Sequence, residues 1–526
     1  MLLSDFSVIT PYGSNQSSCG YCKSKAGSHT YGMSAHFMTC KDYQALINRG
    51  WRRSGRYLYK PNLRDSCCPQ YTIRMKANEF EASKHQRQVV NRFNTFIHDG
   101  DSNFEKDIAS RQRAESLKSA EKKKDASDIP ATDEGQSSVK KPPKPKKSKN
   151  VSTDLKTRIH SSEYLLAEDE GVEWKHRFKV KLEPSSCTDE KHALYSKYQQ
   201  QVHHEDPSKC RVSGFKNFLV DSPLTATKQE DWTESDPGFG SFHQCYYLDD
   251  KLIAVSVIDI LPECVSAVYF FYDPDYSALS LGKYSAQREI ALVQTLGALP
   301  GYEDLKFYYM GFYIFTCHKM TYKGQFHPSF LLDPETYNWI EFKKCQEIMK
   351  SQRYTAFENP VESDPLFEAK IRTIVSCKKG MPASSGDDDI DDDEWDSIDE
   401  DDQDLADFVD KTVQDSDEEG SQGGTDRKKK KTENSASDKK SIERKQKEMD
   451  RIYKETTALP PPGCMNPKEI VDSDLYEVLA LTENNAPRPI VVTKSYKNHK
   501  EVQKTVKEYY SFVGPKLANG MLLYIQ

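Results

Sequence analysis

The chain has 526 residues and a mass of 60.2 kDa, which is long enough for two or three domains of ordinary size. Hydrophobic residues make up 36% and charged residues 29%, a composition that predicts long solvated segments beside the folded parts. The sequence contains no run of about 20 apolar residues, which excludes a transmembrane helix, and a secretory signal is not expected. The thirteen cysteines are therefore expected to be thiols or metal ligands in a reducing compartment.

Charge is distributed unevenly along the chain. The formal net charge is −7, but residues 387–419 hold nineteen acidic residues against one lysine, a local balance of −18. The rest of the chain therefore carries +11 and includes most of the aromatic residues, a composition suited to a polyanionic partner such as nucleic acid. Basic surfaces also serve solubility, so this pattern indicates a class of partner and does not identify one.

The first region, residues 1–101, is rich in Cys, Gly, Tyr and Arg and poor in aliphatic residues. This composition predicts a small Cys-rich domain that needs a metal or another cross-link to be stable. Residues 102–165 turn to Lys, Ser, Asp and Pro and include the basic run 140–147, which is typical of a disordered linker.

Ordered patterns return in residues 166–379, which we expect to form the main folded core. Apolar runs on either side of an Asp-Asp turn predict a β-hairpin over 246–258, and a second β run follows at 268–272. Apolar residues recur at helical spacing over 286–297, and 307–314 is a further predicted strand. The order hairpin, strand, helix, strand predicts a mixed α/β sheet.

The last two regions are a charged insert and a C-terminal segment. Residues 380–448 are acidic and then basic, and we expect them to be a disordered, solvated tether. Residues 449–526 contain a helical pattern near 497–512 and an apolar run at 521–525, and we expect them to complete the core.

Two pairs of cysteines in the first region have the spacing of a metal site. Cys19 and Cys22 are separated by two residues, so both sulfurs can reach one metal at about 2.3 Å. The adjacent Cys67 and Cys68 are the best second pair, and four thiolates favour zinc or an iron–sulfur cluster. Metal-free structural cysteines are the alternative interpretation. Rival ligands for a mixed zinc site are His29, His36 and Cys40.

Between these pairs, guanidinium groups alternate with aromatic rings. Such a segment can pair with phosphate oxygens and stack on unpaired bases, which predicts nucleic-acid contact. An exposed strand with two different faces explains the same pattern equally well. The residues concerned are Trp51, Arg52, Arg53, Arg56 and Lys60.

Several long strings resemble the eukaryotic arginyl-tRNA–protein transferases. In the first region these include GWRRSG at 50–55 and CCPQYTIR at 67–74, and in the core GFGSFHQ at 238–244 and YMGFYI at 309–314. Further matching strings lie at 19–22, 33–36, 42–44, 252–255, 259–262, 272–276, 280–282 and 319–324. The sequence departs from the family pattern at 315–318, where relatives commonly have His-Ser-Cys-Pro.

The resemblance implies an enzyme that transfers arginine from arginyl-tRNA to the N-terminal α-amine of proteins. The acceptors would begin with Asp, Glu or oxidised Cys, and the product would be degraded through the N-degron route with ubiquitin. The family's core is similar to the GCN5-related acetyltransferase fold. Its cysteine site implies a four-iron four-sulfur cluster, with zinc as the alternative, and no small-molecule cofactor for catalysis is expected.

Site residues follow from the matching strings. We expect a direct attack of the amine on the ester, with a nucleophilic Cys317 as a less favoured route. Predicted catalytic residues are His243, Gln244 and Asp259, the last of which either orients the amine or caps a strand. Predicted substrate-binding residues are Tyr309, Lys319, Tyr322 and Lys323, and the predicted metal ligands are Cys19, Cys22, Cys67 and Cys68.

Two other functions stay open at this point. One is an acyl-CoA-dependent N-acetyltransferase, although a typical pyrophosphate loop is not evident, and the other is a zinc-binding adaptor without catalytic activity. The expected partners are arginyl-tRNA and acidic protein N-termini, without a membrane. The expected location is the cytoplasm, with the nucleus as a second location because 140–147 and 427–431 match nuclear-import patches.

Overall fold

The computed structural model describes residues 6–100, 154–163, 174–228, 232–233, 236–360, 460–481 and 486–525. The basic runs at 140–147 and 427–431 and the acidic run at 387–419 lie outside these residues, as does the whole of the predicted insert. Within the described ranges, no helix is both long enough and apolar enough to cross a lipid bilayer.

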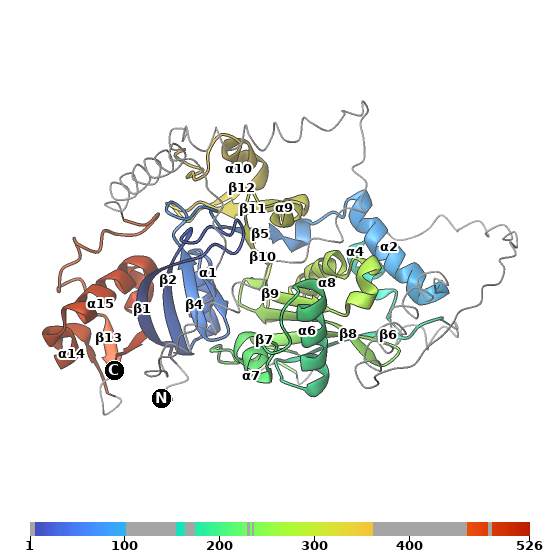
Figure 1. Ribbon diagram of the computed structural model, residues 1–526, viewed down its shortest axis with the longest axis horizontal. Coiled ribbons are helices and arrows are strands. Elements are labelled where there is room, and N and C mark those ends of the chain that lie inside the picture. Colours follow the sequence, from blue (N-terminus) through green and yellow to red (C-terminus); the bar gives the residue numbers. More distant parts are fainter. Residues whose placement is uncertain are drawn as a thin grey trace, which may run out of the picture.

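A seven-stranded mixed sheet joins the two ends of the chain (Figure 1). Its order is β14-β13-β15-β1-β2-β4-β3. Strand β1 pairs antiparallel with β2 and parallel with β15, so the first and last strands of the chain are neighbours. The bounds are β1 Val8–Ser17, β2 Ser28–Phe37, β3 Arg52–Ser54, β4 Tyr57–Pro61, β13 Leu479–Leu481, β14 Pro487–Pro489 and β15 Leu522–Tyr524.

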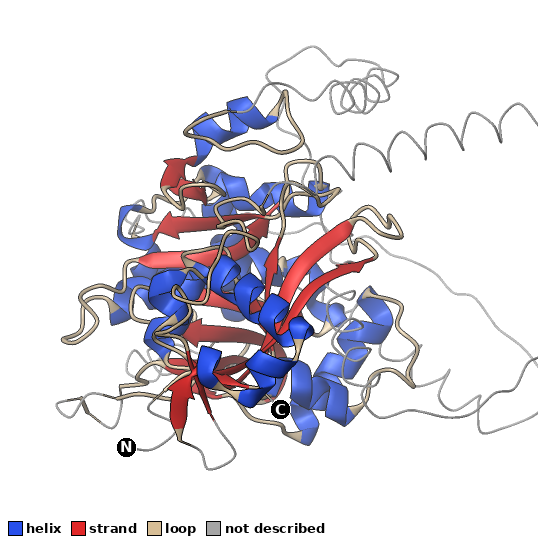
Figure 2. Ribbon diagram, turned by 90° about the vertical axis from the view of Figure 1, so that its left-hand side faces the viewer, coloured by secondary structure: helices blue, strands red, loops and turns tan. Residues whose placement is uncertain are grey.

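The C-terminal segment thus lies in this first sheet and not in the sheet of the predicted catalytic core. Its main helix, α15 (Lys500–Val513), buries Val506, Tyr509 and Val513, which are three and four positions apart and share one helical face. Figure 2 shows the C-terminal helices in front of the strands. The other helices of this part are α1 Cys40–Ile47, η7 Ile490–Val492, α14 Lys494–Asn498 and α16 Pro515–Ala518.

A second sheet of eight strands forms the rest of the molecule. Its order is β12-β11-β5-β10-β9-β8-β7-β6, and the only parallel pair among its described strands is β9 with β10. Both sheets are mixed and both carry helices, which confirms the predicted α/β class. The bounds are β5 Tyr71–Lys76, β6 Phe178–Pro184, β7 Gly240–Leu248, β8 Lys251–Ile260, β9 Cys264–Tyr272, β10 Phe307–Tyr313, β11 Ser329–Leu332 and β12 Trp339–Glu341.

The predicted hairpin is confirmed as β7 and β8. Asp249 and Asp250 link the two strands with φ values of 49° and 64°. Positive φ at both central residues is the signature of a type I′ turn, whose twist matches that of the strands. Strand β5 belongs to this sheet although it lies within the predicted Cys-rich domain, so the first 101 residues contribute to both sheets.

Helices cover both faces of the second sheet. Phe271 of β9 packs against Tyr195 of α6 and Phe215 of α7, whereas the neighbouring Phe270 packs against Tyr246 on the face covered by α8. Helix α4 lies within the range predicted as linker, packs against α8 and places ordered chain before residue 166. The bounds are α2 Lys84–Asp99, α4 Leu155–His160, α6 Asp189–Val202, α7 Val212–Phe215, α8 Leu281–Leu296, α9 His318–Thr321, α10 Phe342–Met349, η2 Ala77–Glu79, η3 Lys216–Val220, η4 Pro274–Leu279 and η5 Tyr322–Gln325.

Candidate functional site

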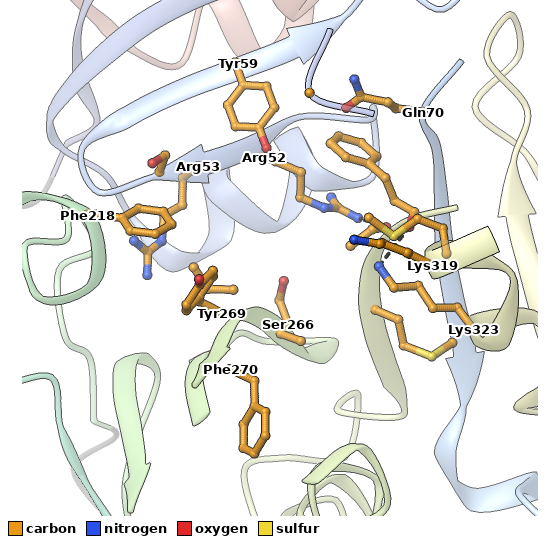
Figure 3. Close-up of a pocket in the computed structure, with 18 of the residues that line it drawn as sticks. Arg52, Arg53, Tyr59, Gln70, Phe218, Ser266, Tyr269, Phe270, Lys319 and Lys323 are labelled. Carbon is orange, nitrogen blue, oxygen red and sulfur yellow. Dashed lines mark hydrogen bonds between the residues drawn. The ribbon is translucent and has the colours of Figure 1, made fainter. Parts of the chain in front are cut away.

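A cavity of about 320 Å³ lies between the two sheets, a volume at the lower end of ligand pockets (Figure 3). The parallel pairing of β9 and β10 covers three residues of each strand, ending at Ser266 and Tyr309. Beyond this point β10 has a register shift and Gly311 adopts a φ of 72°, a conformation that favours glycine. The strands separate there, and residues from β3, β9, β10, α8, α9 and η5 line the space.

Arg52 is a buried cation of this cavity with no carboxylate partner among the described residues. The residue is only 6% exposed. Its guanidinium donates hydrogen bonds to the carbonyl oxygen of Trp51 at 2.7 Å and to that of Gly311 at 3.2 Å. Its Nε has no hydrogen-bond partner among the described residues. Burial lowers the pKa of Arg52 below its ordinary value, although the guanidinium also lies over the rings of Phe312 and Tyr309, at 5.2 and 5.7 Å from their centres. An anionic ligand would pair with the positive charge of Arg52.

Arg53 lines the cavity too, but its charge is neutralised inside the protein. Its Nε and Nη2 donate to both carboxylate oxygens of Asp259 at 2.8 and 2.6 Å, and Ser241 donates to the same carboxylate at 2.6 Å. Strand β3 in one sheet is thereby tied to β8 in the other. Asp259, predicted as catalytic, is fully buried and does not line the cavity.

Three of the four predicted substrate-binding residues do line the cavity. Lys319 and Lys323 extend into it from the segment after β10, close to Arg52 in Figure 3, and Tyr322 lies between them in sequence. The ammonium of Lys323 donates to the carbonyl of Phe312 at 3.0 Å. The fourth, Tyr309, is buried beside the cavity, where its hydroxyl bonds to Asn48 and Arg74.

His243 and Gln244 lie outside the cavity. The imidazole of His243 is completely buried, with Lys191 at 3.0 Å from Nδ1 and the Leu219 carbonyl at 3.0 Å from Nε2. Burial lowers the pKa of His243 to about 4. Gln244 points to the other face of β7 and accepts a hydrogen bond from Tyr246 at 2.8 Å. Neither side chain reaches the cavity, because strand alternation and the covering helices enclose both.

The predicted tRNA-binding residues are divided by the fold. Arg52 and Arg53 face the cavity, but Trp51 is fully buried against Tyr31. The ammonium of Lys60 is buried and donates to the Tyr337 hydroxyl at 2.6 Å. Arg56 is exposed and donates to the carbonyl of His36 at 2.7 Å.

Glu289 is a cavity residue that the sequence analysis missed. It lies on α8, is 2% exposed, and accepts a hydrogen bond from Ser256 of β8 through Oε1. Its Oε2 has no hydrogen bond of normal geometry in the described part of the chain, although the Tyr308 hydroxyl is close enough to affect the carboxyl. Burial raises the pKa of Glu289 to about 7, against hydrogen bonding from Ser256 and Tyr308. The signal was present, since Glu289 sits three residues from Ala286 and four from Val293 on the apolar stripe.

The four predicted metal ligands converge at the end of the first sheet. The sulfurs of Cys19, Cys22, Cys67 and Cys68 all lie within 4.8 Å of one another, with Cys22 and Cys67 at 3.1 Å. The approach is close: a Cβ on Gly27 would lie 2.4 Å from the Cys67 sulfur, so only glycine fits there. Bonds at 2.3 Å place tetrahedral sulfurs about 3.8 Å apart, so the set fits a metal centre.

Hydrogen bonding between the thiols of this cluster shifts their pKa values in opposite directions. Hydrogen bonding from Cys67 and Cys68 lowers the pKa of Cys19, while hydrogen bonding to Cys19 raises the pKa of Cys67 and of Cys68. One thiolate is therefore favoured even without a cation, which prepares the set for metal binding. The group of four possible metal ligands does not include the rival candidates His29, His36 and Cys40.

The cysteine cluster adjoins the cavity. Buried Cys19 and Cys68 pack with Ile314, and Cys317 and Met320 pack against them. Gly20, Tyr21 and Met320 also line the cavity. Cys317 contacts the cluster and is not part of the cavity lining, so its position does not favour the nucleophilic route.

Comparison with known families matches both halves of the site. A family described as "Arginine-tRNA-protein transferase, N terminus" matches residues 17–88, which contain the cysteine cluster and Arg52. A family described as "Arginine-tRNA-protein transferase, C terminus" matches residues 190–333, which contain Glu289 and the lysines of the cavity.

Whole proteins give the same result. Arginyl-tRNA–protein transferase 1 of Drosophila melanogaster is 39% identical over 404 residues, covering 64% of this chain and 82% of that protein. Arginyl-tRNA–protein transferase 2 of Arabidopsis thaliana is 31% identical over 474 residues, covering 67% and 78%. The aspartate/glutamate leucyltransferase of Campylobacter jejuni is 25% identical over 290 residues, covering 55% and 78%. The chain belongs to the arginyl-tRNA–protein transferase family.

Proposed function

We propose that this protein transfers arginine from arginyl-tRNA to the N-terminal α-amine of proteins that begin with Asp, Glu or oxidised Cys. The observation that carries the acidic specificity is Arg52, a buried guanidinium in the cavity that has no carboxylate partner within the part of the chain described. A carboxylate or sulfinate of the acceptor would pair with it, and a neutral side chain would not. The Campylobacter relative, whose name specifies aspartate and glutamate, supports acidic acceptors.

The transfer needs no covalent enzyme intermediate, because the arginyl ester of tRNA is already activated. The amine nitrogen attacks the ester carbonyl carbon, a C–N bond forms, and the C–O bond to the ribose breaks with the electron pair leaving on oxygen. A proton lost by the nitrogen goes to this oxygen. The protein would act by holding the two reactants together, which can contribute about 7 kcal/mol in favourable cases.

We assign Arg52 to the acceptor side of the reaction and not to tRNA. Its guanidinium is buried and faces a cavity that is small for a nucleic-acid backbone. Trp51 and Lys60 are buried outside the cavity, so we propose no RNA contact for either of them. Lys319, Lys323 and the exposed Arg56 remain candidates for the phosphates near the tRNA end.

Arg52→Met tests this assignment. The assay follows labelled arginine from arginyl-tRNA into matched peptides that begin with Asp or Asn. The wild type is expected to modify the Asp peptide, and the variant is expected to lose roughly 30-fold or more of that rate, because a buried charge pair is removed. Arg211→Met, at an exposed position, is the control. Equal rates of Arg52→Met and wild type on the Asp peptide would contradict the role of Arg52.

The same assay separates the two alternative functions. An acyl-CoA-dependent N-acetyltransferase would modify the peptide from acetyl-CoA and ignore arginyl-tRNA, and an adaptor would do neither. Membership of the transferase family favours the first proposal over both. Incorporation of arginine by the wild type decides between them.

We also propose that the four grouped thiols hold a metal centre. A four-iron four-sulfur cluster and a zinc ion both use four thiolates, and thiolate ligands suit either. Visible absorption of anaerobically purified protein, combined with metal analysis, distinguishes the two. Colourless protein with one zinc per chain supports zinc; brown protein with iron and sulfide supports the cluster.

Finer assignments follow as proposals. Strand β9, helix α8 and the parallel strand β10 form a crossover unit, which supports the predicted relation to the GCN5-related fold. We propose that arginylation marks the acceptor for degradation and takes place in the cytoplasm and nucleus. Because β5 and the C-terminal strands cross the predicted domain boundaries, we propose that the two sheets act as one catalytic unit.

A further inference from the structure

We infer that the Glu289 carboxylate binds the guanidinium of the arginyl group, and thereby selects arginyl-tRNA among aminoacyl-tRNAs. This inference rests on the proposed function. Glu289 is the one acidic side chain among the described residues that line the cavity, which otherwise has four cations. The acceptor's negative side chain and the donor's positive side chain would therefore find complementary charges within one cavity.

The first argument is the missing partner of a buried acceptor. Oε1 of Glu289 accepts a hydrogen bond from the Ser256 hydroxyl, and the Tyr308 hydroxyl is also close enough to the carboxyl to lower its pKa, whereas Oε2 has no hydrogen bond of normal geometry in the part of the chain described. No ion pair to Glu289 is formed by the described residues either, since the neighbouring Arg288 turns away to Glu163, 2.5 Å distant. Buried carboxylates are otherwise paired or hydrogen-bonded, so this oxygen calls for a donor from a ligand.

The second argument is the shape of the surroundings. Phe270 of β9 and Tyr308 of β10 line the same cavity and present aromatic rings near α8. A guanidinium is planar, stacks on aromatic faces and donates two parallel hydrogen bonds to a carboxylate, a combination that an ammonium or an apolar side chain does not match. The group at this position therefore fits arginine better than lysine or leucine.

The third argument is electrostatic and supports the geometry. The pKa of Glu289 is raised to about 7 mainly by burial, so the empty site holds a carboxyl that ionises readily when a cation arrives. Two of the cavity cations are engaged elsewhere: Arg53 pairs with Asp259, and Lys323 donates to the Phe312 carbonyl. A bound guanidinium would thus compensate the negative charge of the Glu289 carboxylate.

The experiment compares two aminoacyl groups on the same tRNA. One is arginine; the other is citrulline, attached by chemical misacylation, which has almost the same shape but a neutral end group. Single-turnover transfer to an Asp peptide is measured for wild type, Glu289→Gln and the exposed control Glu347→Gln. The ratio of the two rates is taken within each protein preparation, so a partial folding defect cancels.

We expect wild type and Glu347→Gln to prefer arginine by roughly 30-fold or more, as for removal of one partner of a buried charge pair. Glu289→Gln should lose most of this preference by slowing arginine transfer and keeping or improving citrulline transfer. An unchanged preference in Glu289→Gln overturns the inference. An equal slowing with both groups is such an unchanged preference and overturns it too. Failure of wild type to transfer arginine at all would instead refute the proposed function.

Discussion

Two buried clusters of charged residues in this protein differ in whether their buried polar atoms have hydrogen-bond partners within the protein. In the first, the ammonium of Lys191 contacts Glu183 at 2.6 Å, Ser186 at 2.7 Å and His243 at 3.0 Å, and His243 also contacts the Leu219 carbonyl. In the second, the cavity, Arg52 and Glu289 each keep a buried polar atom without a partner in the described chain. The first cluster is complete without a ligand, and the second is not.

We propose that this difference separates charges with a structural role from charges that bind a ligand. His243 was predicted as catalytic because it is a histidine in a matching string, yet all its surroundings come from the protein itself. Glu289 was not predicted, yet it is the residue whose environment calls for a ligand. A buried charge is costly unless it is paired, so an unpaired one in a cavity indicates binding. Substitutions in the two kinds of cluster should therefore have opposite effects on stability.

The largest effect is expected for Asp259→Asn, at a complete pair. The change leaves the Arg53 guanidinium buried without its carboxylate, and breaking such a pair costs about 3–5 kcal/mol of unfolding free energy. Denaturant unfolding at pH 7 measures the loss. The control is Asp250→Asn, whose partner Lys179 is at the surface and whose change should leave stability unaltered. Wild-type stability of Asp259→Asn would remove the distinction between the clusters.

A gain in stability is expected for Glu289→Gln, at the incomplete site. Because the folded-state pKa of Glu289 is raised from 4.5 to about 7, the folded protein keeps a proton that the unfolded chain loses. This contribution is present below pH 4.5 and is lost as the pH rises to 7, so ionised Glu289 costs up to about 3 kcal/mol at pH 8.

The variant should accordingly be more stable than wild type at pH 8 and similar to it at pH 4.5. Unfolding curves at the two pH values, with Glu347→Gln beside them, measure the difference. Lower stability of Glu289→Gln at pH 8 would mean that the carboxylate is part of a complete structural network, contrary to the comparison above.

The smallest effect is expected for His243→Asn, in the complete cluster. Loss of the imidazole contacts should lower the unfolding free energy by roughly 1–3 kcal/mol at pH 7, with arginine transfer per folded molecule unchanged. A large loss of transfer in folded His243→Asn would restore its predicted catalytic role.

The pH dependence provides a second readout for the same variant. The pKa of His243 is lowered from 6.5 to about 4, so its contribution is present above pH 6.5 and lost as the pH falls to 4. That component, about 3 kcal/mol, should be absent from the variant's stability profile.

Local patterns predicted much of the fold. The hairpin β7–β8 followed from an Asp-Asp turn between apolar runs, and α8 followed from apolar residues at helical spacing. The convergence of Cys19 and Cys22 with Cys67 and Cys68 was predicted from two local spacings. It occurs because β1, β2 and β4 are neighbours, which brings the loops after β1 and β4 to one end of the sheet.

The sequence by itself determined the α/β class, the cysteine set and the family, since turn residues, periodicity and motif strings are local. Only the tertiary structure decided which buried charges have a partner within the protein. Arg53 and Asp259 are 206 positions apart, and His243 and Gln244 differ only in which face of β7 they occupy. Partners at such separations depend on how sheets and helices pack. The same packing places the Glu289 carboxylate in the cavity, where a ligand can reach it.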